Sequence, residues 1–309
     1  MITIYSHDEK GLLTQKEPTS GSWLNVVDPS PEEIVQIQNL GIFQDFITYP
    51  LDLDEQARTE REDGVVFILL RIPNNQGQSA DVPFTTLPLG IILTNQLIIT
   101  VCKRDHEILH SFVTGKVRDF SPGKRNRFVL RLFLRAAQMY LVYLKEINKV
   151  VDTLEDKLQL SLRNKEVLEL LKYQKSLTFF TTALKSNELM MERLQRSQLF
   201  KMYPEDEDLL DDVLIENRQA IEMTNISSNI LSSMMDAFAS IISNNLNVVM
   251  KFLASVTILL SIPTIITSYY GMNVQLPLGG YIHSNLIILG LILVIVILVT
   301  VIFWRKDWF

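Results

Sequence analysis

The chain has 309 residues, a hydrophobic fraction of 47% and a formal net charge of -6. This length allows a soluble domain plus membrane segments, and the lack of a strongly basic domain argues against nucleic acid as a partner. Cys102 is the only cysteine, which excludes a disulfide within the chain and argues against a thiolate metal cluster.

Residues 1–120 are predicted to form an α/β domain. Short apolar or β-branched runs indicate strands. These runs are residues 1–6, 22–28, 64–72, 87–94 and 96–103. Thr94 and Asn95, between the last two runs, predict a tight hairpin. A helix is expected to begin with Ser30 as N-cap, Pro31 as first residue and Glu33 completing a capping box.

Residues 121–203 change to the pattern of long helices. Apolar residues recur at steps of three and four from about residue 127, and again from about residue 165 to residue 200. This periodicity predicts antiparallel helices packed on each other and on the sheet. The basic cluster at residues 123–127 is interpreted as a solvated helix start, since no aromatic or glycine-rich pattern for nucleic acid accompanies it.

Residues 204–270 are predicted to form one continuous helix. Pro204 can open it, and the acids that follow suit the helix dipole. No further proline occurs before Pro263, and no glycine before Gly271. At about 1.5 Å per residue such a helix is on the order of 100 Å long. We therefore expect a stalk that leaves a soluble domain and continues into a membrane.

Two membrane-spanning helices are predicted near the C-terminus. Residues 252–304 contain no Asp, Glu, Lys or Arg. The first span is placed at about residues 251–270 and the second at 285–304, each long enough for one crossing. The alternative, a buried hairpin in a soluble core, is disfavoured because two successive charge-free runs are rare in soluble proteins.

The charges that flank the spans predict their orientation. Lys251 precedes the first span, and Arg305 and Lys306 follow the second, within the tail at residues 305–309. The connecting loop, residues 271–284, has no Lys or Arg. The positive-inside rule then places both termini in the cytoplasm and the loop outside.

A stripe of small and polar residues runs along the first span at alternating steps of three and four. Its members are Asn247, Met250, Ala254, Thr257, Ser261, Thr264, Ser268 and Gly271. A heptad period is typical of helices that wrap around each other. One reading is close packing of membrane helices, with the hydroxyls bonded to the backbone. The other is a pore, which would need several copies because two spans cannot enclose a water path.

The tripeptide Gly271-Met272-Asn273, with the final span and basic tail behind it, resembles the signature of the CorA family of magnesium channels. Residues 23–34 and 52–60 resemble weaker family patterns, and residues 234–253 resemble the family's junction of stalk and membrane. The resemblance implies an α+β cytoplasmic domain with a long stalk helix and two C-terminal transmembrane helices. It also implies a homopentameric, funnel-shaped channel in the cell (inner) membrane.

The resemblance further implies a magnesium channel whose partners are copies of itself and membrane lipid, with no small-molecule substrate. A ring of Asn273 carbonyls would select hydrated Mg²⁺, with Gly271 and Met272 completing the filter; Co²⁺ is a possible second ion. By resemblance, the pore positions are Asn247, Met250, Leu253, Thr264 and Asn273. The stripe adds Thr257 and Ser261 as hydroxyl groups facing the ion's water shell.

Asp212 falls where the family carries an acid that binds cytoplasmic Mg²⁺ between subunits, and Asp211 is its neighbour. The resemblance implies that bound Mg²⁺ there would hold the pore shut. Composition alone favours a solvated, dipole-matched helix start. A partner acid is not placed, since residues 71–81 offer asparagines and only Asp81. The chain also departs from related channels in its acid-free outer loop and in Asp307 within the tail.

Other functions remain open at the level of sequence. A zinc transporter of the same fold, possibly proton-coupled, is one alternative, and the intact Met272 favours magnesium over it. A membrane-anchored scaffold that carries no ions is another, against which Asn273 and the polar stripe argue. An enzyme is disfavoured, because the four histidines show no ligand or triad spacing and no phosphate-binding glycine loop is present.

Overall fold

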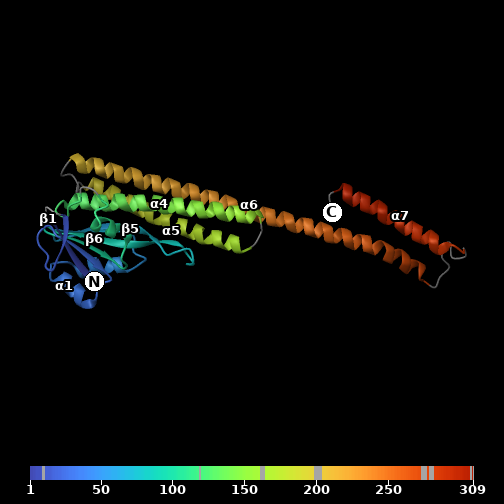
Figure 1. Ribbon diagram of the computed structural model, residues 1–309, viewed down its shortest axis with the longest axis horizontal. Coiled ribbons are helices and arrows are strands. Elements are labelled where there is room, and N and C mark those ends of the chain that lie inside the picture. Colours follow the sequence, from blue (N-terminus) through green and yellow to red (C-terminus); the bar gives the residue numbers. More distant parts are fainter. Residues whose placement is uncertain are drawn as a thin grey trace. The chain divides into compact units, whose positions relative to one another are not determined.

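The computed structural model describes residues 1–8, 11–117, 120–160, 164–197, 204–272, 277, 282–306 and 308. The chain forms two compact units, Met1–Met235 and Asp236–Phe309. The first holds a sheet with its covering helices, and the second holds two apolar helices (Figure 1). The predicted α+β domain, long helix and pair of C-terminal apolar helices are confirmed.

The sheet of the first unit has seven strands among the described residues, in the order β2-β1-β3-β7-β6-β5-β4. Only the pair β3 and β7 is parallel, and the other neighbours are antiparallel. The strands are β1 (Ile2–Asp8), β2 (Gly11–Gln15), β3 (Trp23–Val27), β4 (Arg58–Glu62), β5 (Val65–Asn75), β6 (Phe84–Leu93) and β7 (Ile98–Cys102). All five predicted strands are confirmed, and the hairpin between β6 and β7 turns through residues 94–97.

Helices cover both faces of this sheet. On one face, α1 (Pro31–Gln38) and α2 (Gln44–Thr48) bury Ile37 and Phe46 against β5 and β7. The predicted capping box of α1 is present, with Ser30 and Glu33 bonded as expected. The 3₁₀ turn η1 (Tyr49–Leu51) follows, and α3 (Glu107–Val113) comes after β7. Burial on both faces explains why β5, β6 and β7 read as nearly continuous apolar runs.

Long helices cover the other face (Figure 1). The helices against the sheet are α4 (Arg125–Leu160) and α5 (Asn164–Arg196), and the first part of α6 (Pro204–Tyr270) lies along α5. The Tyr140 ring of α4 meets Phe180 of α5 with ring centroids 4.9 Å apart. Gln174 of α5 donates hydrogen bonds to Ser228 and Ser232 of α6. The last helix is α7 (Ser284–Arg305), in the second unit.

A buried asparagine fastens α5 to the sheet. Strand β4 pairs with β5 only as far as Leu69, so the main chain of Arg71 lies beyond the end of its neighbour. The Asn187 side chain of α5 replaces the missing strand: its oxygen accepts from Arg71 N–H at 2.9 Å and its nitrogen donates to Arg71 C=O at 2.7 Å. Both polar groups of the buried backbone are therefore satisfied.

Substitution of Gly90 in β6 tests how closely η1 packs against the sheet. A Cβ atom there would lie 2.2 Å from the Pro50 ring, so Gly90→Ala forces η1 away from the sheet. We expect a loss of about 1–3 kcal/mol in unfolding free energy, as in overpacked cores. The measurement is thermal unfolding followed by Trp23 fluorescence, with Trp304 and Trp308 replaced by Phe.

The matched control is Gly123→Ala, where the nearest atom, Ser121 Oγ, is 3.7 Å from the added Cβ. Its unfolding midpoint should stay at the wild-type value. Equal midpoints for the two variants would contradict the packing described for Gly90.

Candidate ion-conducting site

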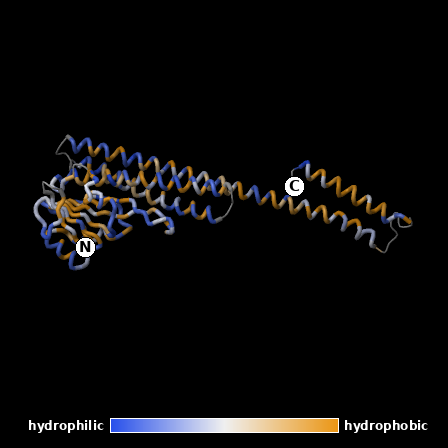
Figure 2. Tube along the Cα trace, viewed as in Figure 1, coloured by the Kyte–Doolittle hydropathy of each residue, from blue (hydrophilic) through white to orange (hydrophobic). Residues whose placement is uncertain are grey.

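Two helices are long and apolar enough to cross a membrane among the described residues, one within Glu205–Tyr270 and the other Ser284–Arg305. Of their most apolar stretches only 6% and 0% is buried. Figure 2 shows how hydrophobic these helices are: α7 and the last part of α6 are coloured mainly as hydrophobic. Apolar helices with so little burial are suited to lipid and not to the core of a soluble protein.

Each apolar helix has one covered side. On α6 one residue is buried, Ser255, and the half-buried residues after it are Val256, Leu259, Ser261, Ile262, Pro263, Ile266 and Tyr270. On α7 the half-buried residues recur every three or four positions, at Ser284, Ile288, Ile292, Ile295, Val299 and Phe303, with Val296 beside Ile295. Both patterns are single helical stripes, so α6 and α7 cover each other along them within the second unit (Figure 1).

The predicted pore residues lie on the free side of α6. Leu253, Thr257 and Thr264 are exposed and fall nearly opposite Ser255 around the helix. Met250 is also exposed, and Ser261 is half-buried. Asn247 is exposed one turn before them. The structure thus brings the central members of the predicted stripe together on a face that α7 does not cover.

The hydroxyl groups of this face are bonded to their own helix. Thr257 Oγ1 donates to Leu253 O at 2.8 Å, and Ser261 Oγ donates to Thr257 O at 2.7 Å. Thr264 Oγ1 donates to Leu260 O at 3.0 Å. Each hydroxyl has one proton and two lone pairs, so these bonds leave oxygen acceptors on the outer surface. The backbone bonding considered from sequence is therefore present, and it orients the lone pairs outward.

The predicted filter begins at the end of α6. Gly271 N–H donates to Thr267 O at 2.9 Å, and the Met272 side chain is exposed. Asn273, the residue on which the prediction depends most, lies outside the described residues. Its position relative to the stripe stays a prediction.

Asp211 and Asp212 lie on the exposed side of α6. Among the described residues no group of three or more His, Cys, Asp or Glu side chains is placed to hold a metal ion. The described residues of one chain therefore supply no ready cation site at these acids.

The basic cluster at residues 123–127 differs from the prediction. Arg127 is not simply solvated, because its guanidinium contacts Asp206 at 2.9 Å and Glu205 at 2.7 Å. These hydrogen bonds, that of Asp206 first, hold the pKa of Arg127 above its ordinary value. Arg125 donates to the Thr94 carbonyl in the β6–β7 turn. The cluster therefore joins α4 to α6 and to the sheet.

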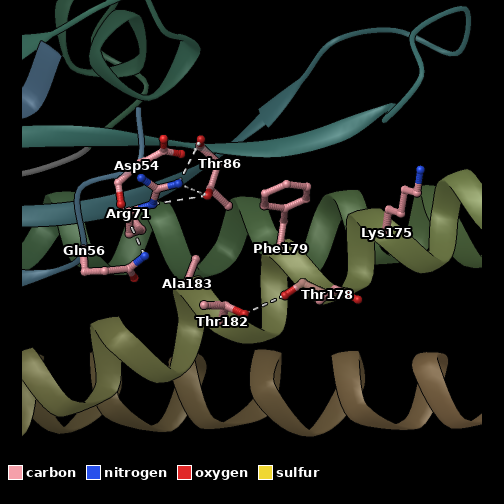
Figure 3. A pocket seen from close by; sticks show the side chains of 9 residues that line it. All are labelled: Asp54, Gln56, Arg71, Thr86, Lys175, Thr178, Phe179, Thr182 and Ala183. Atoms are coloured by element: carbon pink, nitrogen blue, oxygen red, sulfur yellow. Dashed lines mark hydrogen bonds between the residues drawn. The ribbon is translucent and has the colours of Figure 1, made fainter. Parts of the chain in front are cut away.

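A cavity of about 280 Å³ lies between the sheet and α5 (Figure 3). Arg71, only 6% exposed, lines it. Its guanidinium donates to the carbonyls of Leu53 and Glu55 and to Thr86. These bonds use all five N–H groups of the guanidinium. Arg71 therefore holds the segment that precedes β4 against the sheet, and we assign it a structural role.

Comparisons with known proteins cover almost the whole chain. A family model described as "CorA-like Mg2+ transporter protein" matches residues 19–306. The cobalt/magnesium transport protein CorA of Methanocaldococcus jannaschii is 28% identical over 93% of this chain and 90% of its own. That of Thermotoga maritima is 23% identical over 97% and 87%. The complete structure of the M. jannaschii magnesium transporter matches 100% of this chain and 99% of its own, with a TM-score of 0.86 and 25% identity.

The outward lone pairs of α6 give a testable prediction. Thr257→Val and Ser261→Ala remove acceptors without removing a bond between helices. Unfolding temperatures should stay unchanged, while divalent-cation flux should fall several-fold to about tenfold, because one hydrogen bond contributes about 1 kcal/mol. Flux into proteoliposomes and thermal unfolding are the two measurements.

Thr300→Val on α7 is the control, since Thr300 donates to Val296 O at 2.7 Å in the same manner but lies on the other span. Its flux should equal that of the wild type. Equal losses of flux in all three variants would mean that the free face of α6 has no specific role in ion conduction.

Proposed function

Because the chain belongs to the CorA-like Mg²⁺ transporter family, whose members transport divalent cations, we propose that it is a magnesium channel of the cell (inner) membrane. The observation that carries this proposal is the stripe of hydrogen-bond acceptors on the side of α6 turned away from α7. Among the described residues nothing covers that face, and a water-filled path would suit its acceptors.

Several copies are needed to make such a path. One chain offers two candidate spans in the part described, and two helices cannot enclose water. In the proposed ring each copy contributes α6 to the pore wall and α7 to the lipid-facing layer. The family resemblance supports a homopentamer with a funnel-shaped cytoplasmic part. Membrane lipid is the other proposed partner.

The acceptors match the ion as it travels in water. Mg²⁺ is small and sheds its water shell reluctantly. The shell's oxygens point at the metal and its protons point outward, so the shell donates hydrogen bonds. In the proposed mechanism Asn273 carbonyls form the outer filter that receives the hydrated ion, and Thr257, Ser261 and Thr264 accept bonds from it further in.

The remaining pore positions have other roles in the proposed channel. Gly271 allows the chain to leave the helix and bring Asn273 toward the axis, with Met272 beside it. Met250 and Leu253, both more than half exposed, form an apolar constriction that closes by losing water. Asn247 lines the path on its cytoplasmic side.

The membrane potential supplies the driving force in this scheme. Lys251, Arg305 and Lys306 flank the spans and support cytoplasmic termini with the loop outside. An inside-negative potential then contributes about 2.3 kcal/mol per charge per 100 mV, doubled for a divalent ion. Co²⁺, with the same charge, is a second proposed ion. Regulation by intracellular Mg²⁺ at Asp211 and Asp212 is proposed on the resemblance alone.

We also keep the following division of the chain as a proposal. It comprises an α/β domain at 1–120, long helices at 121–203, a stalk and first span at 204–270, an outer loop at 271–284, a second span at 285–304 and a tail at 305–309.

Ion influx into liposomes tests the function directly. Wild-type protein should take up Mg²⁺ down its gradient without a proton gradient, and Asn273→Ala should lose most of this flux. Asn285→Ala is the matched control, because Asn285 begins the second span and lies outside the tripeptide. Zn²⁺ is measured in parallel with and without a proton gradient.

Zn²⁺ uptake that follows the proton gradient, without Mg²⁺ uptake, would replace the proposal by a zinc transporter of the same fold. Absence of flux for both ions would leave a membrane-anchored scaffold. Equal loss in Asn273→Ala and Asn285→Ala would remove the filter role.

A further inference from the structure

Three cations lie at one end of the apolar hairpin, which is the last part of α6 together with α7. Residues 237–306 contain no Asp or Glu, and their only Lys or Arg residues are Lys251, Arg305 and Lys306. Lys251 directly precedes the charge-free residues 252–304, and Arg305 directly follows them. All three cationic side chains are exposed. Positive charge is therefore confined to one boundary of the apolar hairpin.

The two helices bring these cations to the same height. Helices α6 and α7 run side by side in opposite directions within the second unit (Figure 1). Lys251 is about 29 Å from the end of α6 at Tyr270, and Arg305 is about 32 Å from the start of α7 at Ser284. Tyr270 and Ser284 are both half-buried, so the mutual cover of the helices begins at that end. The three cations are thus level to within about one turn.

Lys251 lies on the side of α6 that faces α7. It precedes the buried Ser255 by four residues, and residues at this spacing share a helical face. Leu253 and Thr257 fall on the other side, which is the proposed pore face. The cations are therefore kept away from the proposed ion path, where they would repel Mg²⁺, and they open toward the lipid side of the hairpin.

The end of α7 is held in place by its own contacts. The Lys306 N–H donates to the carbonyls of Ile302 at 3.1 Å and Phe303 at 3.2 Å. The Trp308 ring stacks on the Phe303 ring, with centroids 5.1 Å apart and planes at 8°. The chain therefore turns back at this point and keeps Arg305 and Lys306 beside the end of the helix.

These cations are not neutralised by acids among the described residues. Lys251, Arg305 and Lys306 form no ion pair there. The nearest acid along α6 is Asp236, about 22 Å from Lys251. Asp307 follows Lys306 in the sequence but lies outside the described residues. Three cations beside one acid leave an excess of positive charge, which calls for an anionic partner.

We propose that Lys251, Arg305 and Lys306 bind the phosphate group of an anionic phospholipid. A guanidinium group binds two phosphate oxygens at once, and the ammonium groups add compact positive charges. The acyl chains would lie along the exposed apolar side chains of α7, such as Leu298 and Val301. Trp304, 73% exposed, is at the same height and suits the headgroup region of a bilayer.

The apolar surface beside the cations favours a lipid over a soluble phosphate compound. This inference rests on the proposed function for the leaflet, since the proposed orientation places the cations in the cytoplasmic leaflet, where anionic lipids attract basic residues. Lys251 directly follows Met250 of the proposed constriction. A lipid held there would fix α6 against α7 at the height of the constriction.

Competition between two lipids tests the site. The full-length protein in detergent is mixed with equal amounts of phosphatidylglycerol and phosphatidylcholine that have the same acyl chains. Native mass spectrometry then measures which lipid is retained. The wild type should retain phosphatidylglycerol at least about tenfold more, because each cation strengthens the binding of anionic lipid about fivefold. Lys251→Gln with Arg305→Gln and Lys306→Gln should bring this ratio close to one.

Lys145→Gln with Lys149→Gln and Lys185→Gln is the matched control. It removes the same charge from exposed lysines of α4 and α5, in the first unit. The control should keep the wild-type lipid ratio. Circular dichroism checks that both triple variants have the wild-type helix content. A separate sample contains a large excess of inorganic phosphate, which should leave the retention of phosphatidylglycerol unchanged.

Three outcomes would overturn the lipid site: equal retention of both lipids by the wild type, an unchanged ratio in the triple variant at the hairpin, or displacement of phosphatidylglycerol by phosphate. The last outcome would indicate a site for soluble phosphate compounds. Mg²⁺ influx into phosphatidylcholine liposomes tests the channel separately. A protein that prefers phosphatidylglycerol but gives no influx would keep the lipid site and lose the proposed channel, and influx without lipid preference would do the reverse.

Discussion

Inside hydrocarbon every polar group must find its partner within the protein, and this constraint governs the second unit. The main chain of residues 236–270 and 284–305 satisfies itself by forming α6 and α7. The hydroxyls of Thr257, Ser261 and Thr264 obey the same constraint by donating to the preceding turn. Because each proton is fixed, the direction of each lone pair is fixed too. The chemistry offered by the free face follows from that local bonding.

In the first unit, too, buried polar groups find their hydrogen-bond partners within the protein. Where β4 ends, Asn187 reaches in from α5 to satisfy the open main chain of Arg71. The buried Arg71 guanidinium, which has no ion pair among the described residues, is held by main-chain carbonyls and Thr86. Cys102 has no such role: burial raises the pKa of its thiol to about 11, so it stays protonated and inert in the core.

Patterns local in sequence predicted most of the fold. The capping box at Ser30 and the strands seen as β5, β6 and β7 depend on neighbouring residues, so residue types and short apolar runs were enough to predict them. Strands β2 and β4 were not predicted, because edge strands carry polar or charged residues in place of an apolar run. The partners of Arg127 and Arg71 were also not predictable, since they lie far away in the sequence.

Some features of the candidate site could also be predicted from sequence, and others could not. The stripe on α6 could be predicted because helical spacing determines which residues share a face. That α7 covers the opposite side required the burial of Ser255 and its neighbours. Asn273 and the ring itself depend on groups beyond the described chain.

The tied-back hydroxyls have a consequence for the sign of charge that can pass. Water around an anion turns its protons inward and its oxygens outward, so it needs a wall that donates hydrogen bonds. The free face of α6 offers oxygen acceptors at Thr257, Ser261 and Thr264, and their protons point into the helix. The proposed pore would thus reject chloride without any acidic side chain, since residues 252–304 carry no formal charge.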